Sequence, residues 1–221
     1  MSRKALLAGA TGLTGEALLT RLLADRSWSQ VCVVGRRAPA RTARSLSHVA
    51  TDFTKLEGLG DALAADDVFC CLGTTLRRAG SQAAFERVDY HMVVDLARAA
   101  RQAGARRFIV VSAVGASLKS PAFYSRVKAR MEQAVGDLSF EAVHVLRPSL
   151  LLGPRSERRP AERAAQLVSP LIAPFMVGPL AKYRPVRAEA VAEAMVQLAL
   201  HGAPGVHVHH LPLAAGLGAG G

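Results

Sequence analysis

The chain has 221 residues, half of them hydrophobic, and its 28 Lys and Arg outnumber its 17 Asp and Glu to give a formal charge of +11. This length suits one α/β domain with a sizeable core. No stretch of about 20 uncharged apolar residues occurs, which argues against a membrane span. The arginines are scattered and no basic run carries interleaved aromatic residues, so we expect no nucleic-acid binding.

Apolar runs of strand length alternate with amphipathic helical patterns along the chain. We expect strands at 5–8, 31–34, near Val49, 68–72, 108–111, 142–146 and 206–211. We expect helices at about 13–25, 81–103, 121–136, 161–173 and 188–201. Apolar strands that alternate with helices indicate a parallel sheet covered on both faces. The sequence therefore predicts a single α/β domain over residues 1–221, with a doubly wound sheet of the Rossmann type.

The basic start of the chain, residues 1–4, precedes an apolar run that is too short for a signal peptide. We interpret this run as the first strand and expect a cytoplasmic protein. The three cysteines are odd in number and form no C-x-x-C pair, so a disulfide framework is not expected. Cys70 and Cys71 are interpreted as strand residues rather than nucleophiles.

A glycine-rich segment, GATGLTG at residues 9–15, follows the first strand and opens the first helix. Glycine permits unusual backbone angles, and a missing side chain lets the backbone approach a pyrophosphate. The free N–H groups at the helix start then face the anion. Strand before and helix after are the context that this pattern requires. The residues expected to bind a dinucleotide here are Gly9, Thr11, Gly12, Leu13, Thr14 and Gly15.

The second strand ends in Arg36 and Arg37, where an NAD-binding chain carries an acidic residue. Two guanidinium groups suit a 2′-phosphate, so NADP(H) is favoured over NAD(H). The alternative is that both are solvated surface arginines. Asp52 and Phe53 follow the third strand, where we expect them to reach the adenine.

The fourth strand ends in Leu72, Gly73 and Thr74. A small residue there lets the backbone lie along the cofactor, and the threonine can serve its ribose and phosphates.

Tyr124 and Lys128 form a Y-x-x-x-K pattern. Ser120 and Pro121 are expected to cap and begin the helix, and the spacing of four puts both side chains on one face. A nearby ammonium favours phenolate, so the tyrosine can exchange a proton with a substrate oxygen. Ser112 closes the fifth strand and is expected to hold that oxygen.

Residues 153–187 hold six prolines and interrupt the alternation. This segment is our candidate substrate lid, and a packed connection without ligand contact is the alternative. His207 and His209 share one face of the last strand. No third ligand with characteristic spacing accompanies them, so we predict no metal site.

On these patterns the chain resembles the short-chain dehydrogenase/reductase superfamily, in its extended or atypical group, and most resembles the small NAD(P)-binding proteins related to the human Tat-interacting oxidoreductase. The markers include the glycine-rich segment, residues 71–75 and 111–116, Tyr124 with Lys128, and the R-P-x-x-x-x-G-P pattern at 147–154. The resemblance implies that the backbone near Pro148 and Leu150 meets the nicotinamide. It also implies that Tyr124 is the acid/base, Lys128 its partner and Ser112 the orienting group.

Two positions depart from the family pattern, since Ala113 stands where a second Ser or Thr is usual and Asp89 where Asn is usual. The leading hypothesis is an NADP(H)-dependent oxidoreductase acting on a small carbonyl or alcohol substrate. The departures leave open a non-catalytic NADPH-binding regulator that presents its basic surface to a partner protein. Sugar-nucleotide epimerase activity is a weaker third option, because it normally needs a larger carboxyl-terminal domain. A homodimer is left open.

Overall fold

The computed structural model describes residues 2–152 and 183–211. Its main sheet has seven parallel strands in the order β3-β2-β1-β4-β5-β6-β9. The strands are β1 (Arg3–Ala8), β2 (Trp28–Gly35), β3 (Leu46–Ala50), β4 (Asp67–Cys70), β5 (Arg107–Val111), β6 (Ala142–Arg147) and β9 (Gly205–His210). Every expected strand is present, and the doubly wound Rossmann-type fold is confirmed. The chain reverses its direction of travel across the sheet between β1 and β4, which is where ligands bind in such folds.

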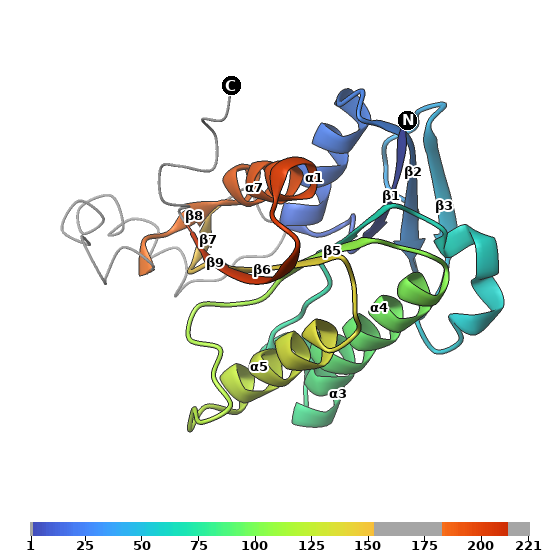
Figure 1. Cartoon of the computed structure of the whole chain (residues 1–221). Coiled ribbons are helices and arrows are strands. Elements are labelled where there is room, and N and C mark those ends of the chain that lie inside the picture. The colour runs from blue at the N-terminus through green and yellow to red at the C-terminus, as the bar shows by residue number, and fades with distance from the viewer. Residues whose placement is uncertain (1, 153–182, 212–221) are drawn as a thin grey trace.

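Helices cover both faces of the sheet (Figure 1). The helices α1 (Leu13–Ala24) and α7 (Ala188–His201) pack together on one face, over a core that includes Leu7, Leu18 and Met195. The helices α4 (Met92–Gln102) and α5 (Phe123–Gly136) cover the other face. Shorter turns of helix are η1 (Glu57–Leu63), α2 (Leu76–Ala79), α3 (Gln82–Glu86) and η2 (Arg87–His91). None of the helices in the described ranges is long and apolar enough to cross a membrane.

Two expected helices differ from the structure. The helix expected over 81–103 is divided by η2, a π-helical turn between α3 and α4. The helix expected to begin at Ser120 and Pro121 begins instead at Phe123, with Ala122 as its N-cap. The Ser120 hydroxyl accepts a hydrogen bond from the Ala122 N–H at 3.2 Å, so it stabilises a turn that precedes the helix.

The expected helix at 161–173 and most of the candidate lid at 153–187 lie outside the described residues, and only residues 183–187 of the lid are described. The chain before residue 153 is hydrogen-bonded to the chain after residue 182. A short parallel pair joins β7 (Leu151–Leu152) to β8 (Val186–Arg187), with Val186 N–H donating to the Leu150 carbonyl at 2.9 Å. The Ser149 hydroxyl also donates to the Arg184 carbonyl. Both ends of the segment therefore lie at the carboxyl edge of the sheet, beside the end of β6.

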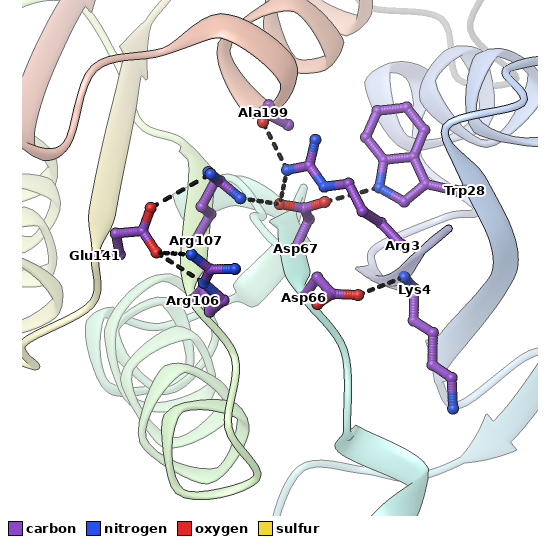
Figure 2. A network of polar contacts seen from close by, with 9 residues as sticks. All are labelled: Arg3, Lys4, Trp28, Asp66, Asp67, Arg106, Arg107, Glu141 and Ala199. Atoms are coloured by element: carbon purple, nitrogen blue, oxygen red, sulfur yellow. Dashed lines mark hydrogen bonds and ion pairs between the residues drawn. The ribbon is translucent and has the colours of Figure 1, made fainter. Parts of the chain in front are cut away.

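The amino edge of the sheet is held by a fully buried carboxylate, Asp67 (Figure 2). Its oxygens lie 2.5 Å from an Arg3 nitrogen, 3.7 Å from an Arg107 nitrogen and 2.8 Å from the Trp28 indole nitrogen, which donates to it. Arg3 also donates to the Ala199 carbonyl of α7 at 2.7 Å. Burial raises the pKa of Asp67 even though these partners favour its ionised form. The network joins the starts of four strands, β1, β2, β4 and β5, and lies at the edge opposite the glycine-rich segment.

Three histidines pack together where β6 meets the edge strand β9. His144 on β6 is 1% exposed and pairs in register with His207, and its Nδ1 lies 3.1 Å from His209 Nε2. His207 and His209 share this face of β9 as expected, and both rings lie within 5.4 Å of the His144 ring, centroid to centroid. His144 Nε2 is buried without a hydrogen-bond partner. Over the described ranges, no group of three or more potential ligands is arranged to hold a metal ion.

Candidate active site

The glycine-rich segment forms a tight loop against the end of β4. Gly9 has a φ of +85°, and a Cβ there would lie 2.6 Å from the Cys71 carbonyl group. A Cβ on Gly15 would lie 2.1 Å from the Gly9 carbonyl oxygen. Both positions therefore need glycine, the first for its backbone angle and both for close approach. The loop carries the chain from β1 directly into α1, whose N-cap is Gly12.

A cavity of about 570 Å³ opens at this loop and runs along the carboxyl edge of the sheet. Most of the residues predicted for the site line its wall. They are Thr11, Gly12, Leu13, Thr14, Leu72, Gly73, Thr74, Ser112, Tyr124, Lys128 and Leu150. The structure therefore gathers into one space the glycine-rich loop, the end of β4, the end of β5 and the first turns of α5. Gly9 and Gly15 support the loop from behind.

The remaining predicted residues do not appear in the described lining of this cavity. Arg36 and Arg37 are exposed just after β2 ends, at the same edge of the sheet. Asp52 is exposed and accepts a hydrogen bond from the Thr54 N–H at 3.0 Å. Phe53 is buried in the core with a φ of 65°. Pro148 is buried, and its carbonyl accepts from the Val114 N–H at 2.9 Å, which joins the ends of β5 and β6.

Lys128 is held by the carboxylate of Asp89, a residue that the sequence singled out only because the family usually has Asn there. Lys128 Nζ lies 2.7 Å from Asp89 Oδ1, and the side chains are 4% and 1% exposed. The other oxygen, Asp89 Oδ2, accepts from the Thr74 N–H at 2.8 Å. Asp89 therefore joins the lysine of α5 to the backbone at the end of β4. It belongs to the π-helical turn η2, and such turns recur at functional sites.

Tyr124 lies one helical turn before Lys128, with its ring 5.3 Å from the Phe85 ring. Burial raises the pKa of the Tyr124 phenol, the Lys128 charge opposes that rise, and the Asp89 charge adds to it. Burial lowers the pKa of Lys128, yet Asp89 and Tyr124 outweigh burial and raise it. The lysine is therefore a charged ammonium despite its complete burial, because the carboxylate beside it is charged too.

A second buried ion pair lies further along the same helix face. Glu132, one turn beyond Lys128, accepts hydrogen bonds from the Ser112 hydroxyl and from Arg147 Nε, the latter at 3.0 Å. Arg147 also pairs with the second Glu132 oxygen. Sequence reasoning missed Glu132, although a carboxylate four residues after Lys128 on a mostly buried face was a signal for it. Ser112 is thus positioned by a carboxylate as well as by the end of β5.

The neighbouring cysteines are thiols rather than nucleophilic thiolates. Burial raises the pKa of Cys70 to about 12 and raises that of Cys71 as well. Both are free, as is Cys32. The cysteines therefore behave as the strand-end residues that their sequence context predicts.

The loop and cavity fit a dinucleotide. No side chain caps α1 at Gly12, so the N–H groups of its first turn are available to an anion in the cavity that Thr11, Gly12, Leu13 and Thr14 line. A Cβ on Gly73 would come within 3.4 Å of Asp89 Oδ1 and 3.8 Å of Lys128 Nζ, so a larger residue there would crowd the passage between the loop and the tyrosine. Fold, loop and the Tyr124–Lys128 face together define a dinucleotide-binding Rossmann domain of the short-chain dehydrogenase/reductase type.

Comparison with known proteins agrees with this class. Residues 9–156 match the model of a family described as NAD(P)H-binding. The chain is 37% identical to Protein HTATIP2 of Rattus norvegicus over 169 residues, which are 75% of this chain and 69% of that protein. It is 35% identical to the mitochondrial protein fmp52 of Emericella nidulans over 167 residues, 72% of each chain. The chain belongs to this NAD(P)H-binding family.

Several solved structures share the fold of this chain. MoeE5 in complex with UDP-glucose and NAD superposes with a TM-score of 0.71 at 21% identity, covering 93% of this chain and 75% of MoeE5. The UDP-glucose 4-epimerase of Thermotoga maritima, with UDP-glucose, gives a TM-score of 0.69 at 16% identity, covering 93% and 76%. At these identities the likeness shows the Rossmann fold alone.

The expectation of a cytoplasmic protein is contradicted by the relatives. Several similar fungal proteins are named mitochondrial, including those of Emericella nidulans and Aspergillus terreus. The expectation rested on the short apolar run at residues 5–8, which is strand β1 and carries no information about the compartment.

Proposed function

We propose that the protein is an NADP(H)-dependent oxidoreductase acting on a small carbonyl or alcohol substrate. The observation that supports this most is the shared helix face of Tyr124 and Lys128 in the wall of the cavity that begins at the glycine-rich loop. A dinucleotide lying from the loop toward α5 would bring its reactive ring to this face. The nicotinamide, when bound, supplies or accepts a hydride at the substrate carbon.

The chain's own residues would orient the substrate and move a proton. Tyr124 exchanges its phenolic proton with the substrate oxygen, and the buried Lys128 ammonium sets the electrostatic environment of that phenol. Asp89 fixes the lysine through the ion pair at 2.7 Å. Ser112, which lines the same cavity, holds the substrate oxygen from the side of β5. Its hydroxyl proton is donated to Glu132 here, so Ser112 would orient a carbonyl oxygen by turning that proton from Glu132 to the substrate.

The expected cofactor contacts of the other predicted site residues also belong to this proposal. Arg36 and Arg37 are exposed at the carboxyl edge and would bind a 2′-phosphate. Asp52 and Phe53 follow β3 at the same edge and would contact the adenine, and the backbone near Pro148 and Leu150 would meet the nicotinamide. Titrating NADPH and NADH by calorimetry tests the cofactor preference. The parent protein should bind NADPH more tightly, and Arg36→Asp should abolish the difference. Equal affinities in the parent would refute the preference.

Replacing Tyr124 by phenylalanine tests the catalytic assignment. The variant should retain NADPH affinity and lose turnover on a confirmed substrate by about 10²–10⁴-fold, the usual contribution of general acid–base catalysis. Tyr90→Phe is the matched control, because the Tyr90 ring packs on Arg130 at 4.8 Å and does not appear in the described cavity wall. Lys128→Met should lower turnover and also weaken cofactor binding. Undiminished turnover by Tyr124→Phe would remove the tyrosine from the mechanism.

The second candidate function is a non-catalytic NADPH-binding regulator. The observation that favours it is the hydrogen bond from Ser112 to Glu132, since the single hydroxyl proton cannot be donated to Glu132 and to a substrate carbonyl at the same time. This candidate predicts tight NADPH binding, no activity in broad carbonyl and alcohol screens, and no effect of Tyr124→Phe on partner binding. Turnover that disappears with Tyr124→Phe would exclude it.

A further inference from the structure

Both buried cations beside the proposed reaction centre are neutralised by carboxylates. Lys128 is paired with Asp89, and Arg147 with Glu132, and none of the four side chains is more than 21% exposed. Asp89 brings a full negative charge to within 2.7 Å of the lysine. An asparagine at this position would accept the same hydrogen bond from the Thr74 N–H without that charge. The environment of Tyr124 therefore lacks the excess of positive charge that stabilises a phenolate.

We propose that Asp89 is a positioning residue that keeps Tyr124 a protonated general acid, so that the protein works as a carbonyl reductase rather than as an alcohol dehydrogenase. The inference deepens the proposed function and rests on it for the reaction. Its electrostatic part rests on the ion pair of 2.7 Å between Lys128 and Asp89 and on the burial of Tyr124 one helical turn before Lys128, and it does not depend on the reaction.

The other groups facing Tyr124 and Lys128 do not reverse this balance. Cys70, at the end of β4, is a neutral thiol with a pKa raised to about 12. Phe85 of α3 contributes only an apolar ring. From β5 and β6, Ser112 and Arg147 contact the carboxylate of Glu132.

Across the cavity, Glu16 of α1 and Arg78 of α2 contribute one charge of each sign to the wall. The lysine, its carboxylate and burial therefore dominate the electrostatic environment of Tyr124, and the lysine is opposed by the other two. Burial and Asp89 raise the pKa of Tyr124, and only Lys128 lowers it.

A protonated tyrosine suits one direction of the redox reaction. In reduction, the substrate carbon receives a hydride from a reduced nicotinamide, the Tyr124 O–H bond breaks, and the proton goes to the substrate oxygen. The carbonyl thereby becomes an alcohol, and water returns a proton to Tyr124. In oxidation, Tyr124 would have to begin as phenolate to accept the alcohol proton. A phenol whose pKa lies above its ordinary value of about 10 supplies little phenolate near neutral pH.

The first test is a titration of Tyr124 in the cofactor-free protein. The chain has three tyrosines, so the phenolate absorbance of the parent minus that of Tyr124→Phe isolates one group. We expect no Tyr124 phenolate up to about pH 9, one unit below the ordinary value. Ionisation of Tyr124 below that pH would overturn the inference. This measurement needs no substrate and no variant of Asp89.

The second test is the same titration in Asp89→Asn. Asparagine retains an acceptor for the Thr74 N–H and removes the charge. A Tyr124 phenolate itself raises the pKa of Lys128, so the lysine should keep its charge and the Tyr124 pKa should fall by about one unit or more. Asp95→Asn is the matched control, because Asp95 of α4 forms an exposed pair with Arg98 and should leave the titration unchanged. A Tyr124 pKa that stays constant or rises in Asp89→Asn would overturn the role of Asp89.

Kinetics with a confirmed substrate then test the direction. Reduction by the parent should be independent of pH between about 7 and 9, whereas oxidation should rise tenfold per pH unit over that range because phenolate is scarce. In Asp89→Asn, the midpoint of the oxidation profile should move down with the phenol pKa. Oxidation as fast as reduction at neutral pH would overturn the directional inference. If no substrate turns over but the titrations behave as expected, the proposed function fails and the electrostatic inference stands.

Discussion

Replacing the buried His144 by leucine is expected to make the protein more tolerant of acid. Burial is the main reason that the pKa of His144 is lowered from 6.5 to about 4, and the charges of His209, His207 and Arg107 add to it. Its Nε2 has no hydrogen-bond partner, so a proton added there would be a buried charge without compensation. A Cβ on Gly202 would lie 2.2 Å from this nitrogen, which shows how tightly α7's end closes over the ring.

The sign and size of the effect follow from linkage between protonation and folding. Because the folded pKa is depressed, the unfolded chain takes up the proton first as the pH falls below 6.5. The stabilisation present above pH 6.5 is then lost until the folded protein also protonates near pH 4, below which the loss levels off. The difference between the two pKa values corresponds to roughly 3 kcal/mol of unfolding free energy.

Urea unfolding at a series of pH values between about 7 and 4 measures this loss. The single tryptophan, Trp28, is buried and provides the fluorescence signal. Protonation of the protein's Asp and Glu side chains changes the unfolding free energy of the parent and of His144→Leu equally. The measurement therefore uses the difference between their two curves of unfolding free energy against pH. That difference should change by roughly 3 kcal/mol across the range in favour of His144→Leu. His91→Leu, at an exposed histidine, should follow the parent. Parallel curves for the parent and His144→Leu would refute the reasoning.

Further predictions concern the glycine loop and the buried carboxylate. Gly12→Val should keep the fold but lose NADPH binding by calorimetry, because its Cβ has ordinary room at 3.4 Å from the Gly9 carbonyl while its side chain enters the anion site. Normal NADPH affinity in a folded Gly12→Val would contradict the loop assignment. Gly15→Ala should instead lower the unfolding free energy by about 1–3 kcal/mol, because its Cβ would overlap the Gly9 carbonyl. Asp67→Ala should lower the unfolding free energy by about 3–5 kcal/mol, measured with urea. Glu141→Ala removes only exposed ion pairing and should lower it by about 0–1 kcal/mol. Similar losses in both variants would contradict the stabilising role of the buried Asp67 network.

The strands and the cavity loop were predictable because their signals are local. A short apolar run followed by glycines fixes both the end of β1 and the start of α1 within a dozen residues. The spacing of Tyr124 and Lys128 likewise lies within one turn of helix, so it placed both side chains in the cavity wall.

The partners of those residues were not predictable, because they come from other elements. Asp89 enters the site through a π-helical turn, and the apolar pattern at 81–103 does not reveal where a helix takes up that extra residue. Glu132 meets Arg147 across the packing of α5 on β6, and Asp67 meets Arg3 across 64 residues. His144 meets His207 and His209 because β9 is added beside β6.

The hydrogen bond from Arg3 to the Ala199 carbonyl spans 196 residues, and it has a consequence for synthesis on the ribosome. The first strand emerges long before its partner on α7 has been made. The helix α1 shares this delay, since Leu18, Leu19 and Leu22 belong to the same core cluster as the apolar residues of α7. When synthesis has reached residue 187, strands β1 to β6 have been made, but no residue of α7 is yet available to cover α1. We expect a nascent chain of this length to expose the apolar face of α1 and to bind chaperones until the 14 residues of α7 have been added.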